Sequence, residues 1–400
     1  MIFSLQVAHD LPNALTATMA PTLFVKRLGM PLEYIGLFFL PFIVTALKWI
    51  WAPVVDNYGS PKFGHRRSWL APLTILVAGT YLAIAFVNPS LETLFLIIGL
   101  LMVKQVFYST QEIAADAYVV ENLSERERGL GASIVWLGKE FGQVIGFAGL
   151  LFVADRYGWR EAFVCAAGLF VLFNVPAILR REPKHTRTVK SRRARPLSFF
   201  QHAVNWRIMS VVFLLSFSVQ MPVAIIGPFL GAKGLTLSEI GIVLGVAASL
   251  GAIISLSIAS VVISRFGPKK TAIAMLFIAP LAMPGFFWMA AQETVTATGV
   301  VGIILWATIC TAPIRMAFYA ARIGWTSAHQ VGTDFTTQQS VWFLGYAASG
   351  VFSGILAANV GWIWFFAVNM AAVTAAILYF VGLHDSIERE VASLRQRVAG

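Results

Sequence analysis

The chain is poor in charge. Asp, Glu, Lys and Arg make up 12% of its 400 residues, about half the share found in soluble domains. The charge is also uneven, with 30 Lys and Arg against 19 Asp and Glu, a formal net charge of +11. Hydrophobic residues account for 58% of the chain, and the mean hydropathy is +0.75. This composition excludes a soluble globular domain as the main part of the protein.

Residue patterns that carry chemistry are also scarce. The two cysteines, Cys165 and Cys310, lie in apolar stretches and nothing in the sequence pairs them, so no disulfide is expected. His and Cys residues are not grouped at metal-ligand spacing, and no Gly-x-x-x-x-Gly-Lys-Ser/Thr phosphate loop or Ser-His-Asp pattern stands out. We therefore expect no cofactor, no bound metal, no direct use of ATP and no enzymatic activity.

Long apolar runs occupy almost the whole chain. Each is about 18 to 25 residues long, which is enough to cross a bilayer as a helix. No cleavable signal peptide is evident before the first run, which we expect to serve as both signal and span. The sequence predicts an all-α membrane protein with twelve transmembrane helices, near 2–25, 34–55, 69–87, 92–115, 130–153, 161–179, 207–231, 239–263, 271–290, 296–321, 337–358 and 361–383.

The positive charges indicate topology. If the N-terminus is cytoplasmic and the twelve helices alternate, most of the 30 Lys and Arg fall on cytoplasmic segments. This bias is typical of membrane proteins and predicts that both termini are cytoplasmic, in the inner (plasma) membrane of a bacterium. The basic excess is therefore explained by the lipid bilayer, and no nucleic-acid partner is expected.

The longest polar stretch, between the sixth and seventh predicted spans, is rich in Lys and Arg. It predicts a cytoplasmic linker at 181–206 between an N-terminal six-helix half at 1–180 and a C-terminal half at 207–384, with a cytoplasmic tail at 385–400. A solvated tether is favoured over a regulatory site.

Two weak internal matches support a duplication. Residues 54–56 correspond to 261–263, and 133–138 correspond to 340–345, both at an offset of 207 residues. A shared offset over two distant segments predicts two related halves around a central cavity. The loop after residue 263 lacks the acid of its counterpart, so we expect a weaker contact there.

The loop between the second and third predicted spans is the most informative local pattern. It combines Asp56, Gly59, Gly64, Arg66 and Arg67. An aspartate at a helix end can face the positive N-terminal end of a neighbouring helix, and arginines can bind carboxylates or lipid phosphates. The loop is either a latch between helices or a basic segment that only sets topology.

This loop resembles the signature loop of major facilitator transporters. Residues 47–56 and 109–117, with Glu-Arg-Glu-Arg-Gly at 125–129, resemble segments of the AmpG-like permeases. Gly-Thr-Asp-Phe-Thr-Thr-Gln at 332–338 resembles a segment shared by these permeases and the pyochelin- and rhizobactin-type siderophore permeases. Asn57 departs from the Arg of many relatives. The resemblance implies a secondary transporter with two six-helix halves that works by alternating access.

Three functions fit this resemblance. The first expectation is proton-coupled uptake of an iron–siderophore complex by a monomer. The alternatives are an AmpG-like permease for muropeptides or other amphipathic solutes, and a non-transporting assembly or pigment-delivery factor on the same fold. The charges inside the spans argue against the last, since a scaffold gains nothing from them.

Inserting an ionisable side chain into the middle of a bilayer costs about 2.5 to 3.5 kcal/mol, so each such residue is expected to have a functional or structural role. Lys104 and Arg315 lie near mid-depth in opposite halves and are predicted to contact an anionic substrate, with internal pairing as the alternative. Lys139 and Glu140 are expected to pair structurally, and Lys48 to snorkel or pair near Asp56. The predicted substrate-binding set is Lys104, Arg315, Gln105, Gln143, Gln220, Tyr319 and Gln338.

Carboxylates within or near the spans are the candidates for carrying a proton. These are Asp10, Glu112 and Glu140, with Asp10 ranked first because its sequence neighbours neutralise it least. Asp116 lies at the cytoplasmic end of its span, close to Arg126 and Arg128 in the sequence. These three residues are expected to form a cytoplasmic gate, together with the loop residues Asp56, Gly59, Gly64, Arg66 and Arg67.

Overall fold

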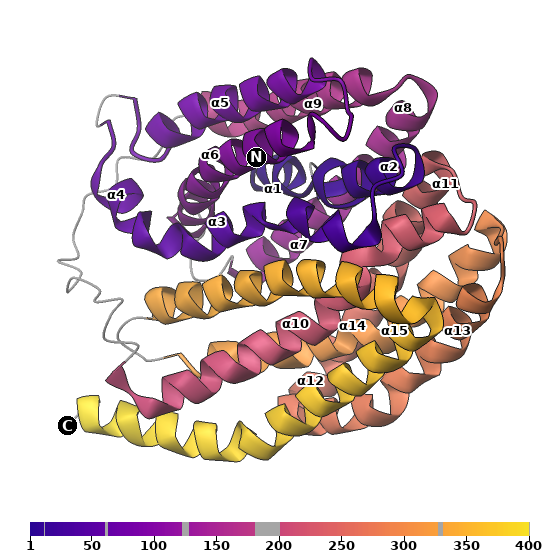
Figure 1. Cartoon of the computed structure of the whole chain (residues 1–400). Coiled ribbons are helices and arrows are strands. Elements are labelled where there is room, and N and C mark those ends of the chain that lie inside the picture. Colours follow the sequence, from indigo (N-terminus) through magenta and orange to yellow (C-terminus); the bar gives the residue numbers. More distant parts are fainter. Residues whose placement is uncertain (12, 61–62, 122–127, 181–200, 327–330, 400) are drawn as a thin grey trace.

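The computed structural model describes residues 1–11, 13–60, 63–121, 128–180, 201–326 and 331–399 (Figure 1). The described part is almost entirely helical, which confirms the predicted fold class. In the first half the elements are α1 (Ile2–Asp10), η1 (Ala14–Met19), α2 (Ala20–Lys26), η2 (Leu32–Phe39), α3 (Pro41–Leu47), η3 (Lys48–Ile50), α4 (Ala52–Asn57), α5 (Arg67–Ala85), α6 (Leu94–Glu121), α7 (Arg128–Val144), η4 (Ile145–Leu150), α8 (Leu151–Arg156) and α9 (Trp159–Leu179). In the second half they are α10 (Ala203–Ala232), α11 (Leu237–Ile242), η6 (Val243–Ala247), α12 (Ala248–Ile278), η7 (Ala279–Ala282), α13 (Met283–Ala291), α14 (Ala297–Gly324) and α15 (Val331–Ala399).

Among the described residues, nine helical stretches are long and apolar enough to cross a membrane. Two of them are interrupted, at Gly267 in α12 and at Gly361 in α15, where the backbone leaves the helical conformation with φ of 78° and 76°. A turn at these positions needs glycine, because a Cβ disfavours positive φ. The count of twelve spans stays a prediction.

The glycine turns repeat along the chain. Every residue of positive φ in the described part is a glycine, and the six form three pairs at offsets of 205, 203 and 203 residues. These offsets are close to the 207 residues of the sequence match. The pairs are Gly29 with Gly234, Gly64 with Gly267, and Gly158 with Gly361. This supports the predicted duplication, while the limits proposed for each half stay predictions.

The two halves lie side by side and contact each other through one end of the bundle (Figure 1). There η2 and α3 pack on α15, α8 and η4 pack on α11, and η1 and α2 pack on α10. Glycines let the helices of the two halves come close together. A Cβ on Gly354 would lie 2.3 Å from the Leu32 carbonyl oxygen, and a Cβ on Gly241 would lie 2.3 Å from the Phe147 carbonyl oxygen, so a side chain would clash at either position. We call this end of the bundle the far end. The opposite end, where Arg180 and Gln201 flank the linker, is called the linker end.

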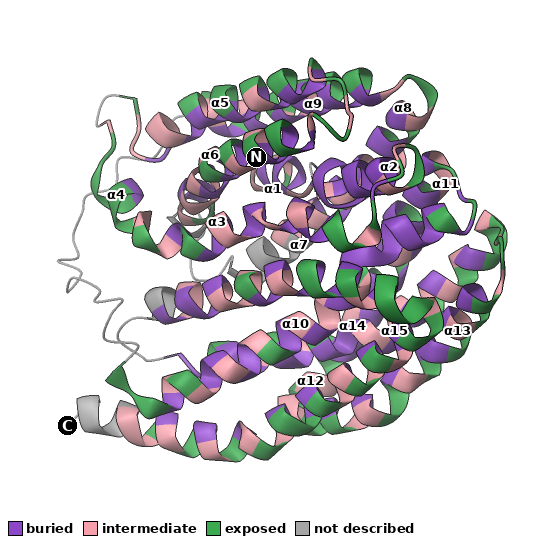
Figure 2. Ribbon diagram, in the orientation of Figure 1, coloured by how far each residue is buried: buried purple, intermediate pink, exposed green. Residues whose placement is uncertain are grey.

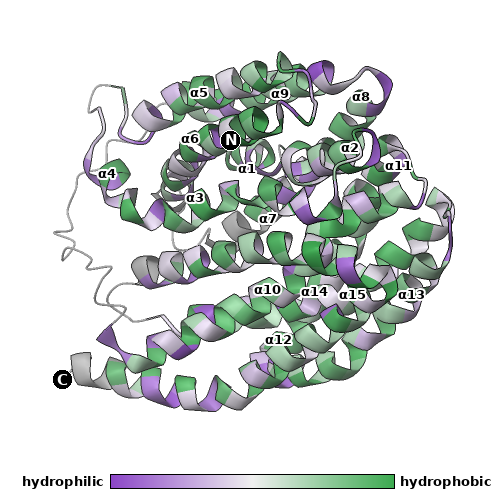
Figure 3. Cartoon of the chain, viewed as in Figure 1, coloured by the Kyte–Doolittle hydropathy of each residue, from purple (hydrophilic) through white to green (hydrophobic). Residues whose placement is uncertain are grey.

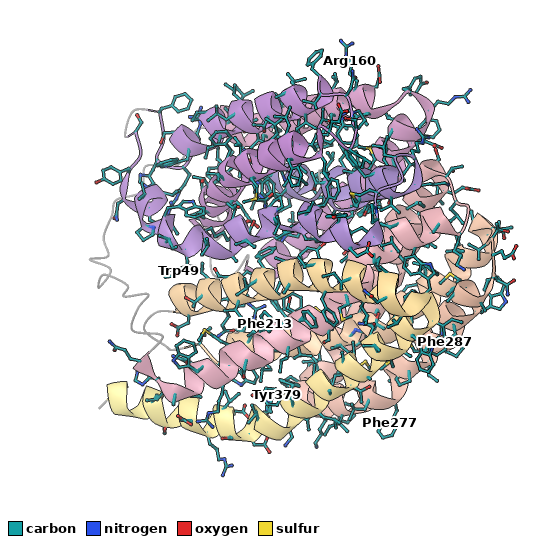
Figure 4. The ribbon with its side chains drawn as sticks, in the orientation of Figure 1. Trp49, Arg160, Phe213, Phe277, Phe287 and Tyr379 are labelled. Atoms are coloured by element: carbon teal, nitrogen blue, oxygen red, sulfur yellow. The ribbon has the colours of Figure 1, made fainter. Side chains whose placement is uncertain are left out.

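The outer faces of both halves are apolar. Many helical residues that are exposed (green in Figure 2) are also hydrophobic (green in Figure 3). Ile75, Phe95 and Phe277 are more than 70% exposed, and Phe277 lies on the opposite face of the molecule from Arg160 (Figure 4). Such a surface is suited to lipid rather than to water.

Candidate functional site

A cavity of about 550 Å³ lies between α7 of the first half and α10, α12, α14 and α15 of the second. Most of its wall is apolar and includes the aromatic rings of Phe147, Phe286, Phe318, Trp342 and Phe366. Its charged and larger polar side chains are Lys139, Glu140, Gln143, Gln220, Arg315, Tyr319, Arg322, Gln339 and Asn369. An apolar cavity with a few polar groups is the usual form of a small-molecule site.

Four of the predicted substrate contacts reach this cavity. Arg315 and Tyr319 come from α14, Gln143 from α7 and Gln220 from α10. Glu140, predicted as a proton carrier, also lines the wall and interacts electrostatically with Arg315. The structure thus brings these residues together, and their contact with a substrate stays a proposal.

Lys104 and Gln105 lie elsewhere. Lys104 is buried inside the first half, where its ammonium donates to the Gln105 side chain at 2.7 Å and lies 5.2 Å from the Tyr108 ring centroid. Gln105 in turn donates to Thr45 at 2.7 Å. No residue of α6 is among those lining the cavity. This placement favours internal packing for Lys104 over the predicted substrate contact.

Arg322 is a cavity residue that the sequence analysis missed. It lies on α14 one residue beyond the predicted end of its span at 321, and it is only 2% exposed. Its guanidinium donates to Gln338 at 3.3 Å and to Gln339 at 3.0 Å. Gln338, predicted as a substrate contact, is thus held behind Arg322. The seven-residue spacing from Arg315 is the signal that could have found it, since residues two turns apart share a helix face.

Lys48 forms an ion pair, one of the two outcomes expected for it. Its ammonium, on η3, lies 2.7 Å from the carboxylate of Glu112 on α6, whereas Asp56 pairs with Arg66. Both side chains are largely shielded, with 7% and 18% of their surface exposed. Glu112 was predicted as a proton carrier; this stays a prediction, and the ion pair with Lys48 favours a structural role for it.

Asp10 lies at the end of α1 and is partly buried. The Asn13 side chain donates to its carboxylate at 3.4 Å. The neighbouring His9 is buried against Tyr108, whose hydroxyl donates to the His9 carbonyl at 2.6 Å. Asp10 is not among the residues that line the cavity, so a role in proton coupling would act at a distance from the substrate.

The loop after α4 is held by polar contacts within the first half. Asp56 pairs with Arg66 at 2.8 Å, and Arg67 donates to the Ile178 carbonyl at 2.6 Å, at the C-terminal end of α9. Gly64 has a φ of 110°, and a Cβ on Gly59 would lie 2.4 Å from the His65 ring. A cation at a helix C-terminus is favourable, so the loop clamps α4, α5 and α9 together.

The equivalent loop of the second half has an acidic partner after all. Lys269 forms an ion pair with Asp385, near the end of α15. The acid missing from the loop itself is thus supplied by another helix. For the predicted gate, Asp116 is exposed on α6, while Arg126 and the side chain of Arg128 lie outside the described residues.

Polar contacts also join the two halves at the far end. Lys26 donates to the Leu235 carbonyl at 2.7 Å. The Asp155 carboxylate accepts hydrogen bonds from the Ser238 hydroxyl at 2.7 Å and from its backbone N–H at 3.4 Å. Ser238 lies in the first turn of α11, so a carboxylate of one half sits at a helix N-terminus of the other.

The sequence is similar to those of known permeases. An "Anhydromuropeptide permease" of Escherichia coli (strain K12) is 24% identical over 396 residues, covering 97% of this chain and 80% of that protein. A "Putative transporter AmpG 4" of Rickettsia conorii is 25% identical over 305 residues, covering 72% of this chain and 73% of that protein.

The fold is similar to those of solved transporters. A bacterial homolog of the human lysosomal transporter Spinster, in an inward-facing and unoccupied conformation, aligns with a TM-score of 0.68 at 14% identity, over 99% of this chain and 96% of that one. A D-xylose-proton symporter aligns with a TM-score of 0.69 at 14% identity, over 95% and 96%.

The family model described as "Major Facilitator Superfamily" matches residues 2–321. The long apolar helices, the two halves and the cavity between them agree with this match. The chain therefore belongs to the major facilitator superfamily and is a multi-pass membrane transporter, not an enzyme, with sequence similarity to the AmpG-like permeases.

Proposed function

We propose that this transporter is a proton-coupled permease for an anionic, amphipathic solute of the muropeptide class. The observation that carries the proposal is the charge of the cavity. Lys139, Arg315 and Arg322 outnumber Glu140 among its charged lining residues in the described part, and they are set in an otherwise apolar, aromatic wall. A solute that joins carboxylates to a sugar or other body with apolar faces matches both features.

The muropeptide class replaces the siderophore complex as the first choice. The relatives described above are named for anhydromuropeptides or as AmpG-like transporters. The cavity itself does not favour a ferric chelate over a sugar-peptide, because both are anionic and amphipathic. The similarity of sequence is what distinguishes them.

Orientation follows from the charge bias along the sequence. With the basic linker on the cytoplasmic side, the far end faces outward and is closed by the contacts of Lys26 and Asp155 with the second half. In this proposal the cavity opens to the cytoplasm. Among the three predicted proton carriers, Glu140 is best placed for coupling, because it shares the cavity with Arg315.

The test is transport by the purified full chain in proteoliposomes. With an inward proton gradient, we expect a radiolabelled anhydromuropeptide to accumulate, and a protonophore to abolish the accumulation. Glu140→Gln should remove the response to the gradient while leaving exchange of labelled for unlabelled solute. Glu92→Gln, at an exposed position, serves as the matched control.

Two results would overturn the proposal. The first is a failure of the wild-type chain to transport the anhydromuropeptide, and the second is uptake that does not change when the proton gradient is collapsed.

A further inference from the structure

Two arginines point to a common side of α14. Arg315 and Arg322 are seven residues apart, which is close to two helical turns, and both line the cavity. Their Cα atoms are therefore separated by about 10 Å along the helix axis at 1.5 Å per residue. Tyr319 lies between them and also lines the cavity. The wall thus carries two positive charges at a fixed spacing.

Arg322 is buried without a negative charge beside it. Its guanidinium lies 4.9 Å from the Phe335 ring centroid, 5.7 Å from that of Phe318 and 5.9 Å from that of Trp342. Its hydrogen-bond partners Gln338 and Gln339 are both neutral. Among the described residues, no carboxylate oxygen lies within 4.0 Å of it. A buried cation that lacks a counter-charge is costly, and an anionic ligand would relieve that cost.

A second polar atom at this position also lacks a partner. Gln338 uses its carbonyl oxygen to accept from Arg322, and its Nε2 is buried with no hydrogen-bond partner in the described structure. An amide N–H beside a guanidinium is a donor pair that a carboxylate can satisfy. The amide oxygens around Arg322 are neutral acceptors, and none of the described groups accepts from Gln338 Nε2 or supplies a negative charge.

Arg315 has a different environment. Its side chain is exposed to the cavity, and Glu140 interacts with it electrostatically. Its charge is thus partly balanced by the protein and remains accessible. The two arginines differ in burial and in partner, so they form two separate positions for an anion and not one shared cluster.

We infer that Arg315 and Arg322 are two anion subsites on one face of α14, which select an elongated solute with two negative groups about two helical turns apart. This inference rests on the proposed function and narrows it to dianionic solutes. One carboxylate binds Arg315 in the open part of the cavity, and the other binds Arg322, which the Gln338 and Gln339 side chains hold in place. The body of the solute lies along Tyr319.

The test uses simple probes, so that it does not depend on muropeptides. Binding of decanedioate and of its monomethyl ester to the purified full chain is measured by thermal stabilisation. We expect the dianion to bind at least ten-fold more tightly than the monoanion, because a charged contact in a partly desolvated site changes affinity by roughly ten- to a hundred-fold. In Arg315→Gln and in Arg322→Gln, the ratio of the affinity for decanedioate to the affinity for its monomethyl ester should fall to near one.

Arg322→Lys keeps the charge but loses the planar fork, and should retain part of the preference. It also shows whether loss of preference in Arg322→Gln reflects damage to the fold. Equal binding of both probes to the wild-type chain, or an unchanged ratio in both glutamine variants, would overturn the inference. A preference for decanedioate in a chain that transports no anhydromuropeptide would leave the inference standing and remove the proposed function.

Discussion

Replacing Lys48 with methionine is expected to lower the free energy of unfolding by about 3 to 5 kcal/mol, because breaking a buried ion pair leaves the other charge without compensation. The ammonium lies 2.7 Å from the Glu112 carboxylate, and both groups are shielded from solvent. Removing both charges together, in Lys48→Met/Glu112→Gln, should recover most of the loss. Denaturant-induced unfolding of the purified chain in detergent, followed by tryptophan fluorescence, measures the three variants.

The matched control is Asp385→Asn, which removes the partner of Lys269 in a pair whose acid is 58% exposed. An exposed pair contributes about 1 kcal/mol or less, so this variant should unfold close to the wild type. If Lys48→Met unfolds like the wild type, or if the double variant is no more stable than the single one, the structural role assigned to this pair is wrong.

Replacing Asp155 with alanine is expected to open the far end. The substitution removes hydrogen bonds to Ser238 and a negative charge at the N-terminus of α11. A charged hydrogen bond contributes about 1.5 to 3 kcal/mol, so the open population should rise roughly ten-fold or more. Thr22, at the contact with Gly227, is 1% exposed and reports on this opening.

The measurement is the rate at which an impermeant thiol reagent labels Thr22→Cys, in a chain without Cys165 and Cys310. Asp155→Ala should raise this rate, whereas Asp385→Ala, which removes an ion pair of the second half, should not. Equal rates with and without the Asp155 carboxylate would show that packing alone closes the far end.

The fold could be predicted because hydropathy reports directly on membrane helices. The break at Gly267 falls between the predicted spans 239–263 and 271–290, and the break at Gly361 falls on the first residue of the predicted span 361–383. The duplication was predicted from two segment matches at an offset of 207 residues, and the structure adds glycine turns of positive φ at nearly the same offset.

The site was only partly predictable, because sequence gives the depth of a residue along a span better than the direction its side chain faces. Arg315 and Lys104 both lie near mid-depth, yet Arg315 faces the cavity and Lys104 faces Gln105 and Tyr108. The partner of Lys48 depends on how α6 packs against η3, which no local pattern encodes. Arg322 was missed because the predicted span ended one residue before it.

The most direct test of the account is to locate the bound solute. An anhydromuropeptide that carries a photoreactive diazirine is cross-linked to the purified full chain, and the labelled peptides are identified by mass spectrometry. The account predicts adducts on the cavity faces of α7, α10 and α14 that unlabelled anhydromuropeptide competes away and that Arg315→Gln reduces. Adducts confined to the outer faces, or adducts that the unlabelled solute does not displace, would contradict it.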